Sequence, residues 1–447
     1  MSVIPSLETP LGPFMLKNPF LLSSGPPTAS SEQIGRAFRS GWAGAVIKTI
    51  RPDGMVIEDL SPRFAALKDR NGAMYGFENI ELLSKRSVSY WTTEIAEIKR
   101  NFPEHLLVGS IMAAPDPDEW RDLAGEVASA GADALEMNVS CPHGMPEQGA
   151  GAAIGQNPQM VRDLARAVCG SVDIPVIVKL TPNVTDIVPV AKAAQAGGAD
   201  MISAINTIQC LSGIDIDSFE PLPTVAGYST YGGYSGPATK PVGLRIVSQI
   251  ASSVDLPVIW IGGVAGFEDA VEYILAGASA VQVCTAVMWH GAGIVREMES
   301  GLREYLARKE MSSPGSLRGL ALGKLKAHQE GAAVARLPFC LHVVRPLRCR
   351  MPGRRVPCPL PSQGKTRYRC VTLRRLFPLC PRLPRKSYHH GTKDWLIRHT
   401  QETFSFEREV CRLYNTVMKL MLTPPRRKDG EWQGKRRPPS RTCLPPL

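Results

Sequence analysis

The sequence has 447 residues and a formal net charge of +11, but the charge is unevenly distributed along the chain. Residues 1–335 hold 26 Lys and Arg against 35 Asp and Glu, whereas residues 336–447 hold 26 against 6. The basic average therefore describes neither part, and it does not by itself indicate a nucleic-acid-binding protein.

Cysteine usage and hydropathy exclude further classes. Only four of the 11 cysteines lie in residues 1–335, which argues against a disulfide-stabilised secreted domain and favours a reducing compartment. The first ten residues lack the basic and apolar regions of a signal peptide. No run approaches the ~18 apolar residues that span a bilayer. We therefore expect a cytoplasmic protein without a membrane segment.

Eight short apolar runs recur between amphipathic, helix-like stretches. Continuous apolar runs predict strands that are buried on both faces, and parallel strands need the intervening helices as crossovers. The runs are residues 20–24, 45–50, 106–112, 134–141, 175–181, 201–207, 257–263 and 280–286. We predict an α/β fold, a (β/α)8 TIM barrel over residues 1–311, followed by a linker over 312–335 and a basic tail over 336–447.

Helix-boundary residues agree with this alternation. Pro158 follows Asn157 at the start of a helix predicted over 159–168, and Thr185 is a candidate cap for a helix over 186–196. Gly197 and Gly198 are expected to end that helix. The segments 51–81 and 209–240 are too long for simple connectors, so we interpret them as lids or binding loops at the catalytic face.

The predicted strands end in polar residues. Because barrel enzymes carry their chemistry at the carboxyl ends of the strands, these ends are the candidate site. Each such residue alone is often only a turn or strand-end side chain. Two lysines and two asparagines on one rim, however, are costly to bury unless a polar or anionic ligand lies between them. The ends are Ser23–Ser24, Lys48–Thr49, Asn138–Cys141, Lys179–Asn183, Asn206–Thr207, Gly262–Val264 and Cys284–Thr285.

The fourth strand end is the most informative because it places one thiol, that of Cys141, beside amide and hydroxyl groups. An ordinary cysteine, with a pKa near ~8.5, is mostly protonated at neutral pH and can donate a proton. Asn138 and Ser140 can hold a polar ring by hydrogen bonds. The alternative is a structural cysteine in a turn.

The glycines at the ends of the last two strands suit a phosphate group. Barrels commonly bind phosphate there through backbone N–H groups, and Gly233 and Gly236 allow a close approach of the preceding loop. No dinucleotide fingerprint, P-loop or zinc-ligand spacing is present, so we predict no metal site. A phosphorylated cofactor with an electron-rich ring, a flavin, fits the two lysines.

These residues carry a family resemblance. Residues 18–309 closely resemble the dihydroorotate dehydrogenase-like flavin barrels. Within that group, the segments 138–145 (Asn-Val-Ser-Cys-Pro-His-Gly-Met), 179–186 and 231–237 look like those of the dihydropyrimidine dehydrogenases. The resemblance implies an FMN-dependent oxidoreductase that reduces the 5,6 double bond of uracil or thymine in pyrimidine catabolism.

The resemblance also implies roles for individual residues. Hydride would pass from FMN N5 to C6 of the ring, and Cys141, on a flexible loop over 142–155, would protonate C5. The ring would be held by Asn79, Asn138, Val139, Ser140, Asn206 and Thr207. FMN would be held by Ser24, Lys48, Thr49, Lys179, Gly236, Gly262, Gly263, Cys284 and Thr285.

Partners follow from the same resemblance. Bacterial relatives work as hetero-oligomers with a separate flavin and iron–sulfur subunit that takes electrons from NADH, so NAD(H) would act through that subunit. The resemblance also implies an iron–sulfur cluster for the family, but none can be predicted for this chain. The seven cysteines beyond residue 335 are never closer than nine positions apart, and the Cys-x2-Cys ligand runs are absent.

Two alternative functions stay open at this point. One is a dihydroorotate dehydrogenase-type enzyme, and the other is a flavin-binding homologue that receives no electrons and is not catalytic. Orotate needs a cation for its carboxylate, and Glu78 in the segment 77–79 favours an uncharged ring instead.

The tail over 336–447 has dense positive charge and no sustained apolar periodicity, so we predict that it is disordered. It could be a nucleic-acid-binding arm, a partner-docking tail or the product of a shifted reading frame in a GC-rich gene. Interleaved aromatic residues for base stacking are few, which argues against nucleic acid.

Overall fold

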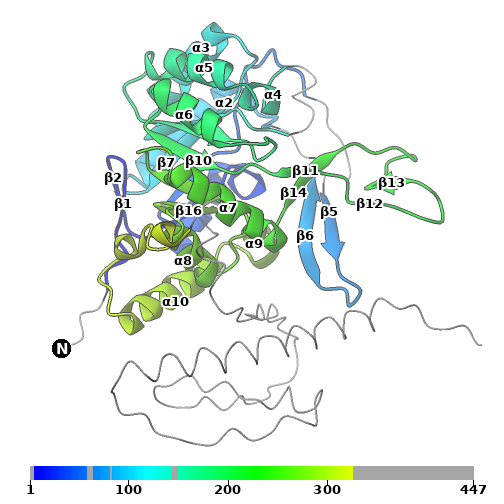
Figure 1. Ribbon diagram of the computed structural model, residues 1–447. Coiled ribbons are helices and arrows are strands. Elements are labelled where there is room, and N and C mark those ends of the chain that lie inside the picture. The colour runs from blue at the N-terminus through cyan, green and yellow to red at the C-terminus, as the bar shows by residue number, and fades with distance from the viewer. Residues whose placement is uncertain (1–4, 58–63, 81–82, 143–148, 326–447) are drawn as a thin grey trace, which may run out of the picture. The chain divides into compact units, whose positions relative to one another are not determined.

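The computed structural model describes residues 5–57, 64–80, 83–142 and 149–325 (Figure 1). Predictions about the tail over 336–447 therefore lie outside the described residues. Eight parallel strands close into a barrel in the order β10-β15-β16-β3-β4-β7-β8-β9. Helices run between successive strands and surround them (Figure 1). The predicted (β/α)8 TIM barrel is thereby confirmed.

Each barrel strand overlaps one of the eight apolar runs. The runs extend past most strand ends because they include the residues of the rim. The barrel strands are β3 (Phe20–Leu22), β4 (Gly44–Val46), β7 (Leu106–Ile111), β8 (Ala134–Asn138), β9 (Val176–Leu180), β10 (Met201–Ala204), β15 (Val258–Ile261) and β16 (Ala280–Val283).

Side chains alternate between the barrel interior and the surrounding helices, as the pleat of a strand requires. In β8, Leu135 and Met137 belong to the large core under the helices, whereas Ala134 belongs to a smaller cluster inside the barrel. That inner cluster includes Leu11 and Leu16 from a hairpin of β1 (Thr9–Leu11) and β2 (Phe14–Leu16). The interior is therefore apolar at the end of the barrel that this hairpin covers.

Several helices start with a side-chain cap, and one of them is the helix predicted to follow Asn157 and Pro158. Asn157 accepts hydrogen bonds from the backbone N–H groups of Gln159 and Met160 at the start of α5. The longer helices are α1 (Ser31–Ser40), α2 (Val88–Asn101), α3 (Pro117–Ser129), α5 (Pro158–Cys169), α6 (Val188–Ala196), α7 (Lys240–Ala251), α8 (Phe267–Leu275) and α10 (Ile294–Arg308). The shorter ones are α4 (Ala152–Gly155), α9 (Thr285–His290), η1 (Pro26–Thr28) and η3 (Pro237–Thr239).

The predicted cap of α6 is wrong. The helix begins at Val188 rather than Asp186, and Thr185 does not cap it. Asp186 Oδ1 accepts a hydrogen bond from the Val188 N–H, and Pro189 occupies the first turn, where a missing N–H costs nothing. The end of the helix is as predicted, with Gly197 at the C-cap and Gly198 at φ 97°.

The two long segments are not simply loops. Parts of both pair with each other in an antiparallel sheet of order β11-β14-β6-β5, made of β5 (Phe64–Lys68), β6 (Met74–Asn79), β11 (Ile208–Cys210) and β14 (Gly232–Ser235). We call this sheet the mouth sheet. Beyond β11 the chain forms an arm with β12 (Gly213–Ile214) and β13 (Pro221–Leu222), which extends away from the barrel in Figure 1.

The chain continues along the barrel after α10. The short helices η4 (Pro314–Leu317) and η5 (Leu322–Lys324) follow, and Leu317 is 1% exposed. Backbone N–H groups of Gly319 and Ala321 donate hydrogen bonds to the carbonyls of Ile274 and Leu275 at the end of α8. Part of the segment assigned to a linker is thus attached to the barrel. None of the helices formed by the described residues is long and apolar enough to cross a membrane.

One histidine, His105, is half-buried directly before β7. The His105 ring stacks on Phe38 with centroids 4.4 Å apart, and Lys17 Nζ lies 3.0 Å from His105 Nε2. Burial, followed by the positive charge of Lys17, lowers the pKa of His105 to about 4 from its ordinary 6.5. The folded protein therefore holds this ring neutral at pH values where the unfolded chain protonates it.

We expect His105 to contribute acid sensitivity. Because its folded pKa is depressed, its stabilisation is present above pH 6.5 and is lost as the pH falls from 6.5 to about 4. His105→Phe keeps the ring stack but cannot titrate, so its free energy of unfolding should fall less steeply over this window. Urea unfolding at several pH values measures the slope. The exposed His290→Gln is the control, and equal slopes for H105F and wild type would contradict the assignment.

Candidate active site

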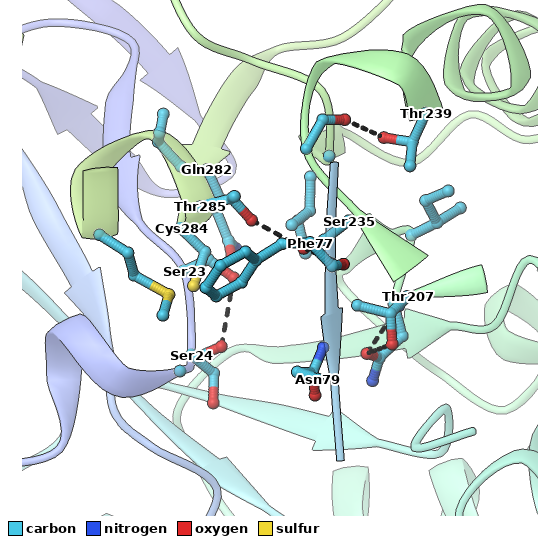
Figure 2. Close-up of a pocket in the computed structure, with 18 of the residues that line it drawn as sticks. Ser23, Ser24, Phe77, Asn79, Thr207, Ser235, Thr239, Gln282, Cys284 and Thr285 are labelled. Atoms are coloured by element: carbon cyan, nitrogen blue, oxygen red, sulfur yellow. Dashed lines mark hydrogen bonds between the residues drawn. The ribbon is translucent and has the colours of Figure 1, made fainter. Parts of the chain in front are cut away.

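A cavity opens at the carboxyl ends of the barrel strands, below the mouth sheet (Figure 2). Its empty space amounts to about 1160 Å³ when the open solvent at its mouth is included. Of the residues singled out in the sequence, Cys141 lines the cavity, together with Ser24, Lys48, Thr49, Asn79, Asn138, Lys179, Asn206, Thr207, Gly236, Gly262, Gly263, Cys284 and Thr285.

Val139 and Ser140 are the two proposed ring-binding residues that do not belong to the cavity lining of the described residues. Val139 is fully buried in the core under the helices, on the opposite face of the chain from Asn138. Ser140 is also fully buried, and its hydroxyl donates a 2.8 Å hydrogen bond to Asn138 Oδ1. Ser140 therefore supports the rim from behind.

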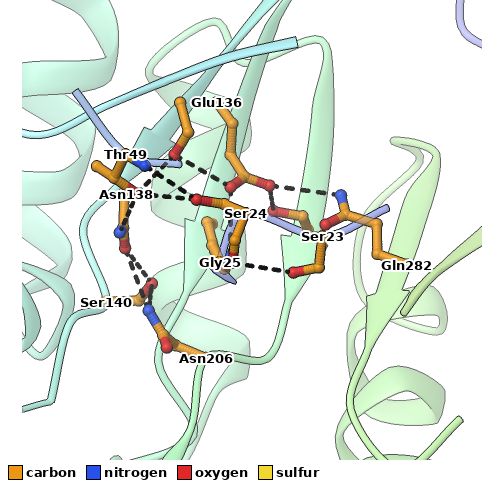
Figure 3. Close-up of polar contacts among 12 residues, drawn as sticks. Ser23, Ser24, Gly25, Thr49, Glu136, Asn138, Ser140, Asn206 and Gln282 are labelled. Carbon is orange, nitrogen blue, oxygen red and sulfur yellow. Dashed lines mark hydrogen bonds and ion pairs between the residues drawn. The ribbon is translucent and has the colours of Figure 1, made fainter. Parts of the chain in front are cut away.

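Asn138 lies at the centre of a hydrogen-bonded network at the rim (Figure 3). Its Nδ2 donates to Thr49 Oγ1 at 3.0 Å, and its Oδ1 accepts from Asn206 Nδ2 at 3.2 Å. Asn206 Nδ2 also donates to Ser140 Oγ at 3.0 Å, and Ser24 Oγ lies 3.1 Å from Thr49 Oγ1. The network holds amide and hydroxyl groups from four strand ends in fixed orientations.

Below this rim lies Glu136, a fully buried carboxylate to which the sequence analysis gave no role. Its Oε1 is 3.3 Å from Lys179 Nζ, and its Oε2 accepts a 2.9 Å hydrogen bond from Ser203 Oγ. Ser110 Oγ and Gln282 Nε2 also donate to it, at 3.4 and 3.5 Å (Figure 3). The signal was present in the sequence, because period-two alternation from Asn138 places an acidic residue inside the barrel.

The mouth sheet contributes one wall of the cavity. Phe77 and Asn79 lie on the same face of β6 and line the cavity, as Figure 2 shows. Asn79 Nδ2 donates a 3.1 Å hydrogen bond to the Gly233 carbonyl on β14. A Cβ atom at Gly233 would lie 2.0 Å from Thr207 Oγ1. Only glycine therefore lets β14 approach Thr207, directly before β11, this closely.

The prediction that Glu78 shapes the site is wrong. Glu78 lies between Phe77 and Asn79, so the pleat of β6 turns it to the opposite face, where it is 0% exposed. Its Oε2 accepts a 2.8 Å hydrogen bond from the Ser212 N–H at the base of the arm. It therefore gives no argument about the charge of a bound ligand.

Glycines form the opposite part of the cavity. Gly236, Gly262 and Gly263 have φ values of 101°, 112° and 72°, a backbone conformation that other residues rarely adopt. A Cβ at Gly263 would lie 2.8 Å from the Lys240 backbone nitrogen. Nearby, Thr285 Oγ1 donates a 2.9 Å hydrogen bond to Ser235 Oγ. Such bare backbone beside hydroxyl groups suits a phosphate group.

The cysteines differ in their surroundings. Cys141 is 6% exposed and lines the cavity directly after β8. Burial, together with nearby Glu78, raises the pKa of Cys210 to about 12, and burial raises that of Cys169 to about 11. Neither of these two lines the cavity, so both are thiols outside the site. Residues 143–148, within the loop predicted to be flexible, lie outside the described residues.

The barrel and its polar rim define an oxidoreductase of the dihydroorotate dehydrogenase-like class. The sequence profile of the family described as Dihydroorotate dehydrogenase matches residues 6–306, and the chain belongs to this family. The resemblance stated from the motifs is thereby confirmed.

Curated relatives fall into two groups. The chain is 37% identical over 337 residues to Dihydropyrimidine dehydrogenase (NADP(+)), chloroplastic, of Arabidopsis thaliana, covering 73% of this chain and 79% of that protein. It is 38% identical over 307 residues to NAD-dependent dihydropyrimidine dehydrogenase subunit PreA of Escherichia coli K12, covering 68% and 74%. It is also 40% identical over 319 residues to Dihydroorotate dehydrogenase B (NAD(+)), catalytic subunit, of Pyrococcus abyssi, covering 71% and 99%.

The rim network should contribute measurably to stability. Asn138→Ala removes the shared partner of Thr49, Ser140 and Asn206, and buried polar groups left without partners cost about 1–3 kcal/mol. We expect the free energy of unfolding in urea to fall by about that amount. Asn101→Ala, at the exposed end of α2, is the control and should change it by less than about 0.5 kcal/mol. An unchanged unfolding midpoint for N138A would show that the network carries no net energy.

Proposed function

We propose that this protein is an FMN-dependent oxidoreductase that reduces the 5,6 double bond of uracil or thymine to the dihydropyrimidine. The observation that carries the proposal is the convergence of the Cys141 thiol, several amide and hydroxyl side chains and two lysines on one cavity. The identity to two proteins named dihydropyrimidine dehydrogenase supports the choice of substrate.

The lining residues fit FMN at one side of the cavity. Gly236, Gly262 and Gly263 form a cradle that side chains would fill, which suits the phosphate. Lys48 and Lys179 supply positive charge for the ring, whose reduced form is electron-rich. Ser24, Thr49, Cys284 and Thr285 complete this side of the site. When bound, FMN supplies the hydride that is added to C6 of the pyrimidine.

The other side of the cavity fits the pyrimidine. Asn79, Asn138, Asn206 and Thr207 present amide and hydroxyl groups, which match the carbonyl and imide groups of uracil. Hydrogen bonds hold Asn138, Asn206 and Asn79 in place before a ligand binds, the last through the Gly233 carbonyl, which reduces the ordering cost of binding. Cys141 donates its proton to C5 and becomes a thiolate, so one hydride and one proton complete the reduction.

We infer the source of the electrons from the relatives, not from the residues that line the cavity. PreA of Escherichia coli is named as a subunit of an NAD-dependent enzyme. We infer a hetero-oligomer in which a partner subunit with a flavin and an iron–sulfur cluster oxidises NADH. The 447 residues of the sequence contain no Cys-x2-Cys run, so none of them is assigned to a cluster.

Dihydroorotate oxidation is the second candidate, because the relative from Pyrococcus abyssi matches over 99% of its length. Dihydroorotate carries a carboxylate that needs a positive partner. Of the two lysines that line the cavity, Lys179 is paired with Glu136, which balances its charge. Because we assign both Lys48 and Lys179 to FMN, no lysine in the described lining is left for a substrate carboxylate, which favours a neutral ring.

The two substrates can be compared directly. We expect the purified chain to be yellow with FMN, and its reduced flavin to be reoxidised by uracil or thymine at least about tenfold faster than by orotate. Stopped-flow absorbance at the flavin band measures both rates. Faster reoxidation by orotate would favour the second candidate. Bound flavin that neither compound reoxidises would indicate a non-catalytic homologue, and a chain that cannot take up FMN would refute both activities.

Cys141→Ala tests the proton donor. The variant should still bind FMN, while reoxidation by uracil slows by about 10²–10⁴-fold, the usual contribution of a positioned acid. Cys169→Ala, which removes a thiol from α5 outside the cavity, is the matched control and should keep its rate. If C141A reacts as fast as wild type, another group protonates C5.

A further inference from the structure

We infer that Glu136 is a positioning residue that sets the reduction potential of the bound flavin by balancing the charge of Lys179. This inference rests on the proposed FMN site. Glu136 is fully buried in the barrel interior, and it does not belong to the cavity lining of the described residues. It acts through two residues that do line the cavity, Lys179 and Gln282.

The contacts of Glu136 come from four other strands. Ser110 on β7 and Lys179 on β9 meet its Oε1, while Ser203 on β10 and Gln282 on β16 meet its Oε2. A buried carboxylate is costly unless it is paired and hydrogen-bonded, and both conditions hold here. The barrel therefore supports one negative charge directly behind one positive charge of the cavity.

The position of this pair matters for a ring that changes its charge. Oxidised FMN takes up two electrons and one proton to give a reduced ring with one additional negative charge. The Lys179 ammonium, 4% exposed, favours that anion, whereas Glu136, only 3.3 Å from Lys179 Nζ, opposes it in a poorly screened interior. Glu136 thus keeps the flavin a stronger reductant than the lysine alone would allow.

Gln282 gives a second contact of the carboxylate with the cavity. Its Nε2 donates to Glu136, which fixes the direction of the amide, and its Oε1 is buried without a hydrogen-bond partner among the described residues. Gln282 itself lines the cavity, so this hydrogen bond ties the carboxylate to a second residue of the site. Glu136 therefore orients one group as well as balancing another.

The test is Glu136→Gln in the full chain loaded with FMN. Glutamine keeps the shape of glutamate and one of its two acceptor oxygens, but it removes the charge. We expect the ratio of affinities for reduced over oxidised FMN to rise about tenfold or more, which for a two-electron couple raises the potential by about 30 mV. Equilibration with a reference dye measures the potential, and flavin fluorescence measures the affinity for oxidised FMN.

Two variants separate charge from packing. Glu136→Asp keeps the charge and should restore the ratio to within about threefold of wild type. Ser203→Ala removes a hydrogen bond that Glu136 accepts but removes no charge. It should leave the ratio of affinities for reduced over oxidised FMN within about threefold of wild type. A shift of equal size in S203A and E136Q would overturn the inference, because it would then be a consequence of disturbed packing.

A second comparison covers the case in which the uncompensated lysine prevents E136Q from folding. Lys179→Met should lower the affinity ratio, and adding Glu136→Gln to it should raise the ratio again by about tenfold. Equal ratios in the single and double variants refute the inference alone, since both bind FMN. Failure of wild type to bind FMN refutes the proposed function and this inference together.

Discussion

The closed barrel imposes one constraint on which the site depends, which is that alternate side chains of every strand must face a narrow interior. Near the β1–β2 hairpin the interior is filled by apolar residues such as Leu21, Val108 and Ile177. Two residues further along the same strands, the next inward-facing residues are Ser23, Ser110 and Lys179. The inward-facing side chains thus change from apolar to polar within two residues. This change places ionised groups at the floor of the cavity while the strands stay buried.

That constraint explains how much of the fold could be predicted. Eight apolar runs separated by helix-like stretches permit few arrangements other than a parallel barrel, and the strand ends then locate the site. The alternation also explains why Asn138, the last residue of β8, and Cys284, directly after β16, line the cavity. Residues at such positions need only the correct assignment of the strand that precedes them.

The mouth sheet could not be predicted in the same way. Four barrel strands, β7 to β10, lie between β6 and β14 in the sequence. The pairing of β6 with β14 therefore depends on contacts that no local pattern encodes. The assignment of Glu78 to the site failed for this reason, because a residue in a loop has no defined face, whereas a residue in a strand has one of two. Glu136 was overlooked for a different reason: its surroundings come from four other strands, and each contributes a single polar side chain.

The pairing of the two long segments has a consequence for how this barrel can be redesigned. Gly233 fits against Thr207 and pairs with Asn79, so the wall of the cavity is built jointly from segments that lie far apart in the chain. A chimaera that exchanges only one segment with a relative would bring together surfaces that were never shaped for each other. This wall of the cavity is therefore transferable only when both segments are grafted as a unit, and the barrel beneath can remain as it is.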